Sequence, residues 1–177
     1  MDEFEKKLVL FFRKPNSKML DVFSHLISSV YLLLFFWFIV IVLAMFFDII
    51  NGIHMILGLS IVFILHFIIS EGIFKWGGRR FSFERIRPYK AHPELIQPIG
   101  KKFHDSSLPS SHLASMVGGL VILVSFYKFI WLFAIIVAAL LSWSRIRNGM
   151  HYPSDVLLGI ALGVLYGYLS LLIVGMF

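Results

Sequence analysis

The connection SRIRNGMHYPSDV, which joins two long apolar runs near the C-terminus, holds the residues of this sequence best suited to chemistry. It supplies two arginines, a histidine and an aspartate: Arg145, Arg147, His151 and Asp155. Guanidinium groups bind oxyanions through paired hydrogen bonds, and an imidazole oriented by a carboxylate can act as a nucleophile or base. A second histidine, His112, lies where another apolar run begins. These residue types can together bind an anion and react with it.

The elements that must position these residues are apolar helices. Hydrophobic residues make up 59% of the 177-residue chain and charged residues only 15%, whereas roughly a quarter of the residues in a soluble domain are charged. The composition predicts an all-α fold, a polytopic transmembrane helix bundle of five to six helices with an N-terminal interfacial helix. The absence of cysteine excludes disulfides, thiolate metal sites and a thiol nucleophile.

Four or five apolar segments are long enough to cross a bilayer. The third and fourth are short taken alone, but polar residues at their ends can sit at the interface, so we count five spans, at about residues 25–47, 53–74, 112–126, 130–143 and 156–177. Residues 1–20 include FEKKLVLFFRK, which predicts an amphipathic helix lying in the membrane interface. Polar residues 75–111 predict an active-site loop region, and we expect residues 1–177 to form a single membrane domain. The repeat of Gly159, Gly163 and Gly167 predicts close helix packing within the bundle, with a dimer seam as the alternative. We therefore expect a monomer or a weak homodimer.

The number of membrane crossings places all the chemically interesting residues on one face. Two spans separate the loop of residues 75–108 from the connection 144–155, so both must lie on the same side. The cations and histidines gathered there are Arg79, Arg80, Arg85, Arg87, Lys90, Lys101, Lys102, His104, His112, Arg145, Arg147 and His151. The carboxylates available to pair with them, Glu84, Asp105 and Asp155, are too few. This excess of cations predicts an anionic ligand, and arginine forks favour a phosphate group.

The net charge of +6 could have other causes, and the positions of the cations along the sequence decide between them. The cations lie at the edges of apolar segments and not in a solvated run, which excludes a nucleic-acid-binding tail and indicates membrane lipids as neighbours. Lys75, Lys101 and Lys102 are interpreted as charges that set the membrane orientation. Two histidines and an aspartate could instead bind zinc, but the surrounding arginines would repel a cation and no HExxH motif occurs. We predict no metal and no cofactor.

Three short motifs in order resemble the type 2 phosphatidic acid phosphatase (PAP2) superfamily. Its pattern is Lys-x6-Arg-Pro, then Pro-Ser-Gly-His, then Ser-Arg-x5-His-x3-Asp. This sequence has Arg80-x6-Arg87-Pro88, then Pro109-Ser-Ser-His112, then Ser144-Arg-x5-His151-x3-Asp155. It departs from the pattern at Arg80, which replaces a lysine, and at Ser111, which replaces a glycine. The resemblance covers roughly residues 80–155.

The resemblance implies roles for the matching residues. His151 would attack phosphorus to form a phosphohistidine, and His112 would protonate the leaving oxygen and later activate water. Asp155 would accept a hydrogen bond from His151 and fix its tautomer. The phosphate-binding residues would be Arg80, Arg87, Ser110, Ser111 and Arg145. No motif position assigns a role to Arg147, interpreted as a loop or headgroup contact, and His25, His54 and His66 are interpreted as structural.

The resemblance also implies a lipid phosphate or pyrophosphate as substrate. Candidates are undecaprenyl pyrophosphate, lipid A 1-phosphate, phosphatidylglycerol phosphate and phosphatidate, and nothing in the sequence separates them. The alternatives are a non-catalytic lipid-phosphate binder or flippase and, less favoured because those relatives are soluble, a haloperoxidase. The positive-inside rule would place the active site in the cytoplasm. The resemblance instead implies a bacterial cytoplasmic (inner) membrane with the site facing the periplasm or exterior, which we expect because phosphate binding accounts for most of these cations.

Overall fold

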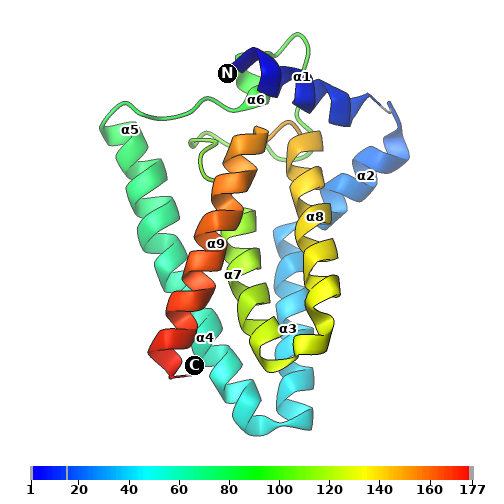
Figure 1. Ribbon diagram of the computed structural model, residues 1–177. Helices are drawn as coiled ribbons and strands as arrows, with labels where there is room; N and C mark the ends of the chain where they lie inside the picture. Colours follow the sequence, from blue (N-terminus) through cyan, green and yellow to red (C-terminus); the bar gives the residue numbers. More distant parts are fainter. Residues whose placement is uncertain (1, 15, 176–177) are drawn as a thin grey trace.

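The computed structural model describes residues 2–14 and 16–175, which form a bundle of helices with most of its polar chain gathered at one end (Figure 1). The elements are α1 (Asp2–Arg13), α2 (Lys18–Ile27), α3 (Val30–Phe47), α4 (Ile49–Leu65), η1 (His66–Gly77), α5 (Gly78–Arg80), α6 (Pro88–Ala91), α7 (Ser111–Phe126), η2 (Lys128–Ile130), α8 (Trp131–Arg147) and α9 (Pro153–Val174). Four stretches are long and apolar enough to cross a membrane, at residues 30–47, 49–80, 128–147 and 153–174. The apolar α7, with 16 residues, is shorter than these stretches, so the fifth predicted span stays a prediction, while the all-α membrane bundle is confirmed.

One helical rod extends further than the sequence indicates. The prediction ends the second span near residue 74, but α4 continues through η1, a π-helical segment, and through α5 to Arg80. Glu71 and Lys75 therefore lie on a helix inside the bundle and not at the start of a loop. Wide turns of this kind are rare and often occur at functional sites.

The centre of the bundle is the contact between α7 and α9. The glycine stripe of α9 lies here: a methyl group on Gly159 would lie 2.7 Å from the Ser110 carbonyl oxygen, and one on Gly163 would lie 2.8 Å from that of Ala114. Gly167 is equally close to Val121 of α7. The stripe thus packs within the bundle, as the first of the two interpretations predicts. At about 1.5 Å per residue the 16 residues of α7 span only about 24 Å, so its N-terminus lies inside the end of the bundle.

The N-terminal segment covers the polar end of the bundle. The interfacial helix expected over residues 1–20 is shorter, since α1 ends at Arg13 and a second helix, α2, begins after the N-cap Ser17. Figure 1 shows α1 lying across the ends of α8 and α9, and Val9 is fully buried there. The charged face of α1 reaches inward as well as outward, because Glu5 is also buried. The segment that was expected only to rest on lipid is therefore part of the architecture around the site.

Candidate active site

A polar cavity of about 250 Å³ lies at the end of the bundle covered by α1, where α7 begins and α8 ends. It brings together the loop and the connection that the crossing count places on one face. Its lining residues are Glu71, Lys75, Arg87, Phe103, Asp105, Ser111, His112, Arg145 and His151. Three cations and two carboxylates, together with two histidines, make this a site suited to an anion.

His151 presents one ring nitrogen to the cavity cations. Its Nδ1 lies 2.7 Å from the carbonyl oxygen of Ser107, which fixes Nδ1 as the protonated nitrogen. Its Nε2 faces Arg145 Nη2 at 3.2 Å and Arg87 Nη1 at 3.4 Å. Burial lowers the pKa of His151 well below its ordinary value, and the two guanidinium groups lower it further. The imidazole is therefore neutral at neutral pH, with a lone pair on Nε2.

Arg145 and Arg87 are both buried beside His151 but differ in their partners. Arg87 donates to the Asp105 carboxylate at 2.7 Å and to the carbonyl oxygens of Asp105, Ser106 and Met150. Arg145 has no ion pair with a carboxylate among the described residues, and its Nε has no hydrogen-bond partner. A buried guanidinium without a counter-ion is costly, so this geometry fits an anion held in the cavity.

Lys75 occupies the position expected for Arg80. The Lys75 ammonium lies 2.9 Å from Glu71 and 2.8 Å from Asp105, inside the cavity lining. Arg80 is exposed at the end of α5 and does not line the cavity. The cause is the extended α4–η1–α5 rod, which carries Lys75 on its buried side and leaves Arg80 at its tip. The interpretation of Lys75 as an orientation charge therefore needs correction.

Asp105 balances two of the cavity cations. Burial alone would raise the pKa of Asp105, but Arg87 and Lys75 outweigh it and lower the pKa to about 2. The carboxylate stays ionised and holds both cations in place.

Asp155 does not make the predicted hydrogen bond to His151. Its Oδ2 lies 3.9 Å from Nδ1 and instead accepts from the backbone N–H of Tyr152 at 2.8 Å, while the Ser107 carbonyl takes the ring proton. The other oxygen, Oδ1, accepts from Arg85 at 2.6 Å. Asp155 thus fixes the turn that carries His151, one step removed from the imidazole.

Arg85 links this carboxylate to the N-terminal helix. It donates to Glu5 of α1 as well as to Asp155, and Glu5 also accepts from the backbone N–H of Ser154 at the start of α9. The motif spacing gives no signal for this bridge, because Glu5 is far away in sequence.

The PSSH motif separates into residues with different surroundings. Ser110 is fully buried against Gly159, its hydroxyl has no hydrogen-bond partner within residues 2–14 and 16–175, and it does not line the cavity. Ser111 lines the cavity, and its hydroxyl donates to Glu71 at 2.5 Å. His112 lines both the cavity and a neighbouring apolar groove. Of the two serines predicted to bind phosphate, the structure brings only Ser111 to the cavity.

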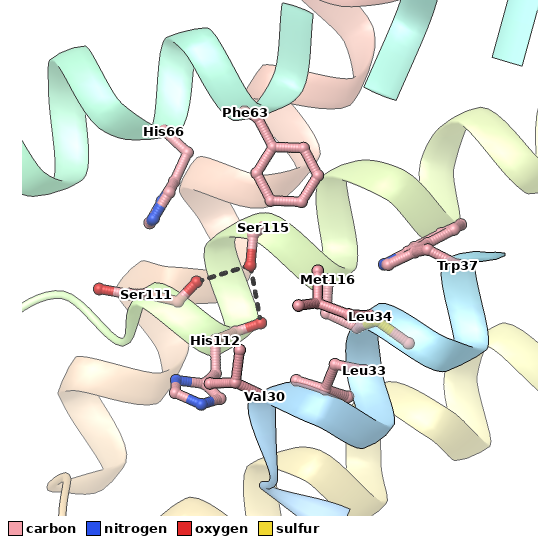
Figure 2. Close-up of a pocket in the computed structure, with 10 residues that line it drawn as sticks. All are labelled: Val30, Leu33, Leu34, Trp37, Phe63, His66, Ser111, His112, Ser115 and Met116. Atoms are coloured by element: carbon pink, nitrogen blue, oxygen red, sulfur yellow. Dashed lines mark hydrogen bonds between the residues drawn. The ribbon is translucent and has the colours of Figure 1, made fainter. Parts of the chain in front are cut away.

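An apolar groove of about 170 Å³ continues from the cavity toward the side of the bundle, between α3, α4 and α7 (Figure 2). Its walls are Val30, Leu33, Leu34, Trp37, Phe63 and Met116, with His66 and Ser115 as additional polar residues. Ser111 and His112 line the groove and the cavity alike, so the two spaces meet at the first turn of α7.

Arg147 has structural partners and lies away from the cavity. It donates to Asp21 of α2 at 2.7 and 3.1 Å and to the Phe12 carbonyl oxygen at 2.9 Å. Only 2% of its surface is exposed, which corrects its interpretation as a loop or headgroup contact. Arg147 holds the two N-terminal helices against the end of α8.

Comparison with known proteins agrees with this arrangement. The model of the PAP2 superfamily matches residues 55–177. An undecaprenyl-diphosphatase of Sulfolobus acidocaldarius is 35% identical over 94 residues, which cover 51% of this chain and 44% of that protein. The match thus spans less than half the length of that relative.

Two solved structures share the fold. LpxE from Aquifex aeolicus has a TM-score of 0.70 at 22% identity, covering 93% of both chains. A transmembrane PAP2-type phosphatidylglycerolphosphate phosphatase from Bacillus subtilis has a TM-score of 0.67 at 23% identity, covering 96% of this chain and 83% of the other. Since the family model covers most of the chain and every residue after Met55, including both histidines of the cavity, this protein belongs to the PAP2 superfamily.

Proposed function

We propose that this protein is a metal-independent lipid phosphatase that hydrolyses a phosphate monoester or pyrophosphate through a phosphohistidine intermediate. The observation that carries the proposal is Arg145, a buried cation that has no carboxylate partner in the described part of the chain and lies 3.2 Å from Nε2 of His151. A phosphoryl group bound there would pair with Arg145, Arg87 and Lys75 and bring its phosphorus to Nε2.

In the first step Nε2 of His151 attacks phosphorus, and the bond to the leaving oxygen breaks. The Nδ1 proton, held by the Ser107 carbonyl, keeps the lone pair on the attacking nitrogen. His112 gives its proton to the leaving oxygen, and the three cations offset the charge that builds on the other phosphoryl oxygens.

In the second step water attacks the phosphorus of phosphohistidine. His112, now neutral, takes a proton from that water, and the phosphorus–nitrogen bond breaks. Inorganic phosphate leaves, His151 regains its neutral form and His112 is again protonated. This chemistry needs no metal, and three cations in the lining would oppose the binding of a divalent ion.

A lipid is the substrate that suits both spaces. The polar cavity would take the phosphate and the apolar groove the chain attached to it, and the groove meets the cavity beside His112. The relatives carry the names undecaprenyl-diphosphatase and phosphatidylglycerolphosphate phosphatase. Undecaprenyl pyrophosphate, phosphatidylglycerol phosphate, lipid A 1-phosphate and phosphatidate are therefore the compounds to assay.

We further propose that the site faces the periplasm or exterior of a bacterial inner membrane. The chain has no cysteine, so a single one introduced at the exposed Lys102 would report its own side. We expect a membrane-impermeant thiol reagent to label it on intact cells. Labelling only after lysis would place the site in the cytoplasm.

A non-catalytic phosphate binder or flippase is the second candidate, since the same buried cations would also serve it. Phosphate release by the purified protein, assayed across the four lipids, separates the two. We expect release from at least one lipid and a loss of about 10³-fold or more in His151→Ala. His54→Ala is the matched control, because His54 bonds only the Ile50 carbonyl of its own helix. Binding without turnover would support the binder, and activity restored by a divalent ion after chelation would rule out the metal-independent mechanism.

A further inference from the structure

His66 is a buried histidine whose bonding is incomplete. It is the first residue of η1 and is 7% exposed, at the edge of the apolar groove. Its Nε2 lies 3.6 Å from Glu71, while its Nδ1 has no hydrogen-bond partner among the described residues. Figure 2 shows the ring extending from its helix toward Ser111. A buried polar nitrogen without a protein partner is unfavourable, so Nδ1 is suited to pair with a bound polar group.

The position of His66 relates directly to the leaving group. His112, which would protonate the leaving oxygen, lines both the cavity and the groove. The leaving oxygen therefore lies at the boundary of the two spaces, and the next atoms of the substrate lie in the groove, where His66 is part of the wall.

The other polar side chains of the groove already have partners. The Ser111 hydroxyl donates to Glu71, and the Ser115 hydroxyl donates to the carbonyl oxygens of Ser111 and His112 (Figure 2). Six apolar side chains form the rest of the groove wall. With His112 assigned to the leaving oxygen, His66 is the remaining side chain in the described lining of the groove that can bind an anion.

We infer that His66 binds the second phosphate of a lipid diphosphate and so makes the enzyme favour diphosphates over monophosphates. This inference rests on the proposed phosphatase function. When a diphosphate is cleaved, the bond between the terminal phosphorus and the bridging oxygen breaks, and the leaving group is a lipid monophosphate whose charge lies in the groove. When a monoester is cleaved, the atom next to the leaving oxygen is a carbon, which carries no charge and needs no donor.

The neighbours of His66 suit this role. Glu71 lies 3.6 Å from Nε2 on one side, and on the other side Nδ1, which has no partner among the described residues, would donate to a phosphate oxygen. Lys75 is the nearby cation that opposes a charged imidazole, and it is itself paired with Glu71 and Asp105. Glu71 thus orients His66 as well as Ser111.

The test compares farnesyl diphosphate with farnesyl monophosphate, which share one chain, using kcat/KM of the purified full-length protein. His66→Phe keeps the bulk and removes both donors, and we expect its preference for the diphosphate to fall by roughly 10- to 100-fold, the usual effect of a hydrogen bond to a charged group. His66→Asn places an amide near the Nδ1 position and should keep most of the preference. His66→Gln places its amide near Nε2 and should lose it. A purely structural histidine would not separate the last two variants.

The controls distinguish this inference from the proposed function. His54→Phe removes a histidine from the same helical rod and should leave both substrates unchanged. Equal losses on the two substrates in all three His66 variants would overturn the inference while leaving the phosphatase function intact. Unchanged ratios in His66→Phe would overturn it as well. If the unmodified protein released no phosphate from any lipid, the proposed function itself would fail.

Discussion

Arg145 and Arg147 lie at the same end of α8 and are both buried, but their side chains lie in two regions that differ in the partners they offer. Arg147 enters what we call the N-terminal clasp: Arg13, Asp21, Ser24, Arg147 and Asn148. In the clasp Asp21 faces Arg147, and Asn148 bonds Ser24 and Ser28. Arg145 lies in the cavity lining, where among the described residues its Nε has no hydrogen-bond partner and no carboxylate is paired with it.

Burial alone does not tell a structural arginine from a ligand-binding one. Both side chains are shielded from water to the same degree, at 4% and 2% exposed, so burial does not separate structural residues from functional ones. The partners of these two side chains differ. Arg147 is paired with the Asp21 carboxylate and holds helices together, whereas Arg145 has no carboxylate partner among the described residues and fits a bound anion.

Alanine substitutions of Arg145 and Arg147 should have opposite effects on activity and stability. Arg145→Ala should lower phosphate release by about 10²- to 10³-fold, because it removes a donor to the transferring phosphoryl group. Its melting temperature in detergent should stay the same or rise, since an unpaired buried charge is removed. Arg147→Ala should instead lower the free energy of unfolding by about 2–4 kcal/mol, because Asp21 and the Phe12 carbonyl lose their donor.

Thermal unfolding and phosphate release, measured on both variants, test whether Arg145 serves activity and Arg147 serves stability. Arg145→Lys serves as the conservative control and should recover part of the activity, since it restores the charge but not the fork. If Arg145→Ala were as destabilised as Arg147→Ala and remained active, the distinction between the cavity and the clasp would be wrong.

Lys75 and Arg80 offer a second matched pair, on the α4–η1–α5 rod. Lys75→Gln should reduce phosphate release by about 10- to 100-fold, because Lys75 lines the cavity and carries one of its three cations. Arg80→Gln should stay within about twofold, since Arg80 is exposed beyond the cavity. The measurement is kcat and KM on the best lipid of the panel. A larger loss for Arg80→Gln than for Lys75→Gln would mean that the phosphate-binding cation is the one at the first motif position, Arg80, and not Lys75.

This pair also marks the limit of what the sequence could predict. Arg87, Arg145, His112 and His151 stand at motif positions in polar stretches, and all four line one cavity. The positions of the long apolar helices were predictable too, because they follow from the lengths of the apolar segments along the sequence. Lys75 was not, because the hydrophobic pattern fades near residue 74 while the helix continues to Arg80.

Long-range pairing accounts for the other misses. Glu5 and Asp21 lie in the N-terminal segment, whose amphipathic pattern indicates only contact with a membrane surface. Their bonds to Arg85 and Arg147 connect residues 80 and 126 positions apart, and no local spacing reveals them. Asp155 was predicted to reach His151 directly, but the backbone of Ser107 occupies that place. The position of a backbone carbonyl group cannot be predicted from the types of the residues.

The smallest expected effect concerns Asp105, one of the two carboxylates of the cavity and the one paired with both Arg87 and Lys75. Its pKa is lowered to about 2 from the ordinary 3.8, so its ionised form stabilises the folded protein above about pH 4, and that stabilisation is lost as the pH falls through about 2. Asp105→Asn should therefore be less stable than the unmodified protein at pH 7, by no more than about 2 kcal/mol, and the gap should shrink as the pH approaches 2. Melting temperatures in detergent at pH 7 and pH 3 measure it. Glu84→Gln is the control, since Glu84 makes only a 4.0 Å contact with Arg79 at the surface and should give little gap at either pH. A gap for Asp105→Asn that stayed constant with pH would mean that its side chain stabilises the cavity through shape and hydrogen bonding rather than charge, and that the cations beside Arg145 do not depend on it.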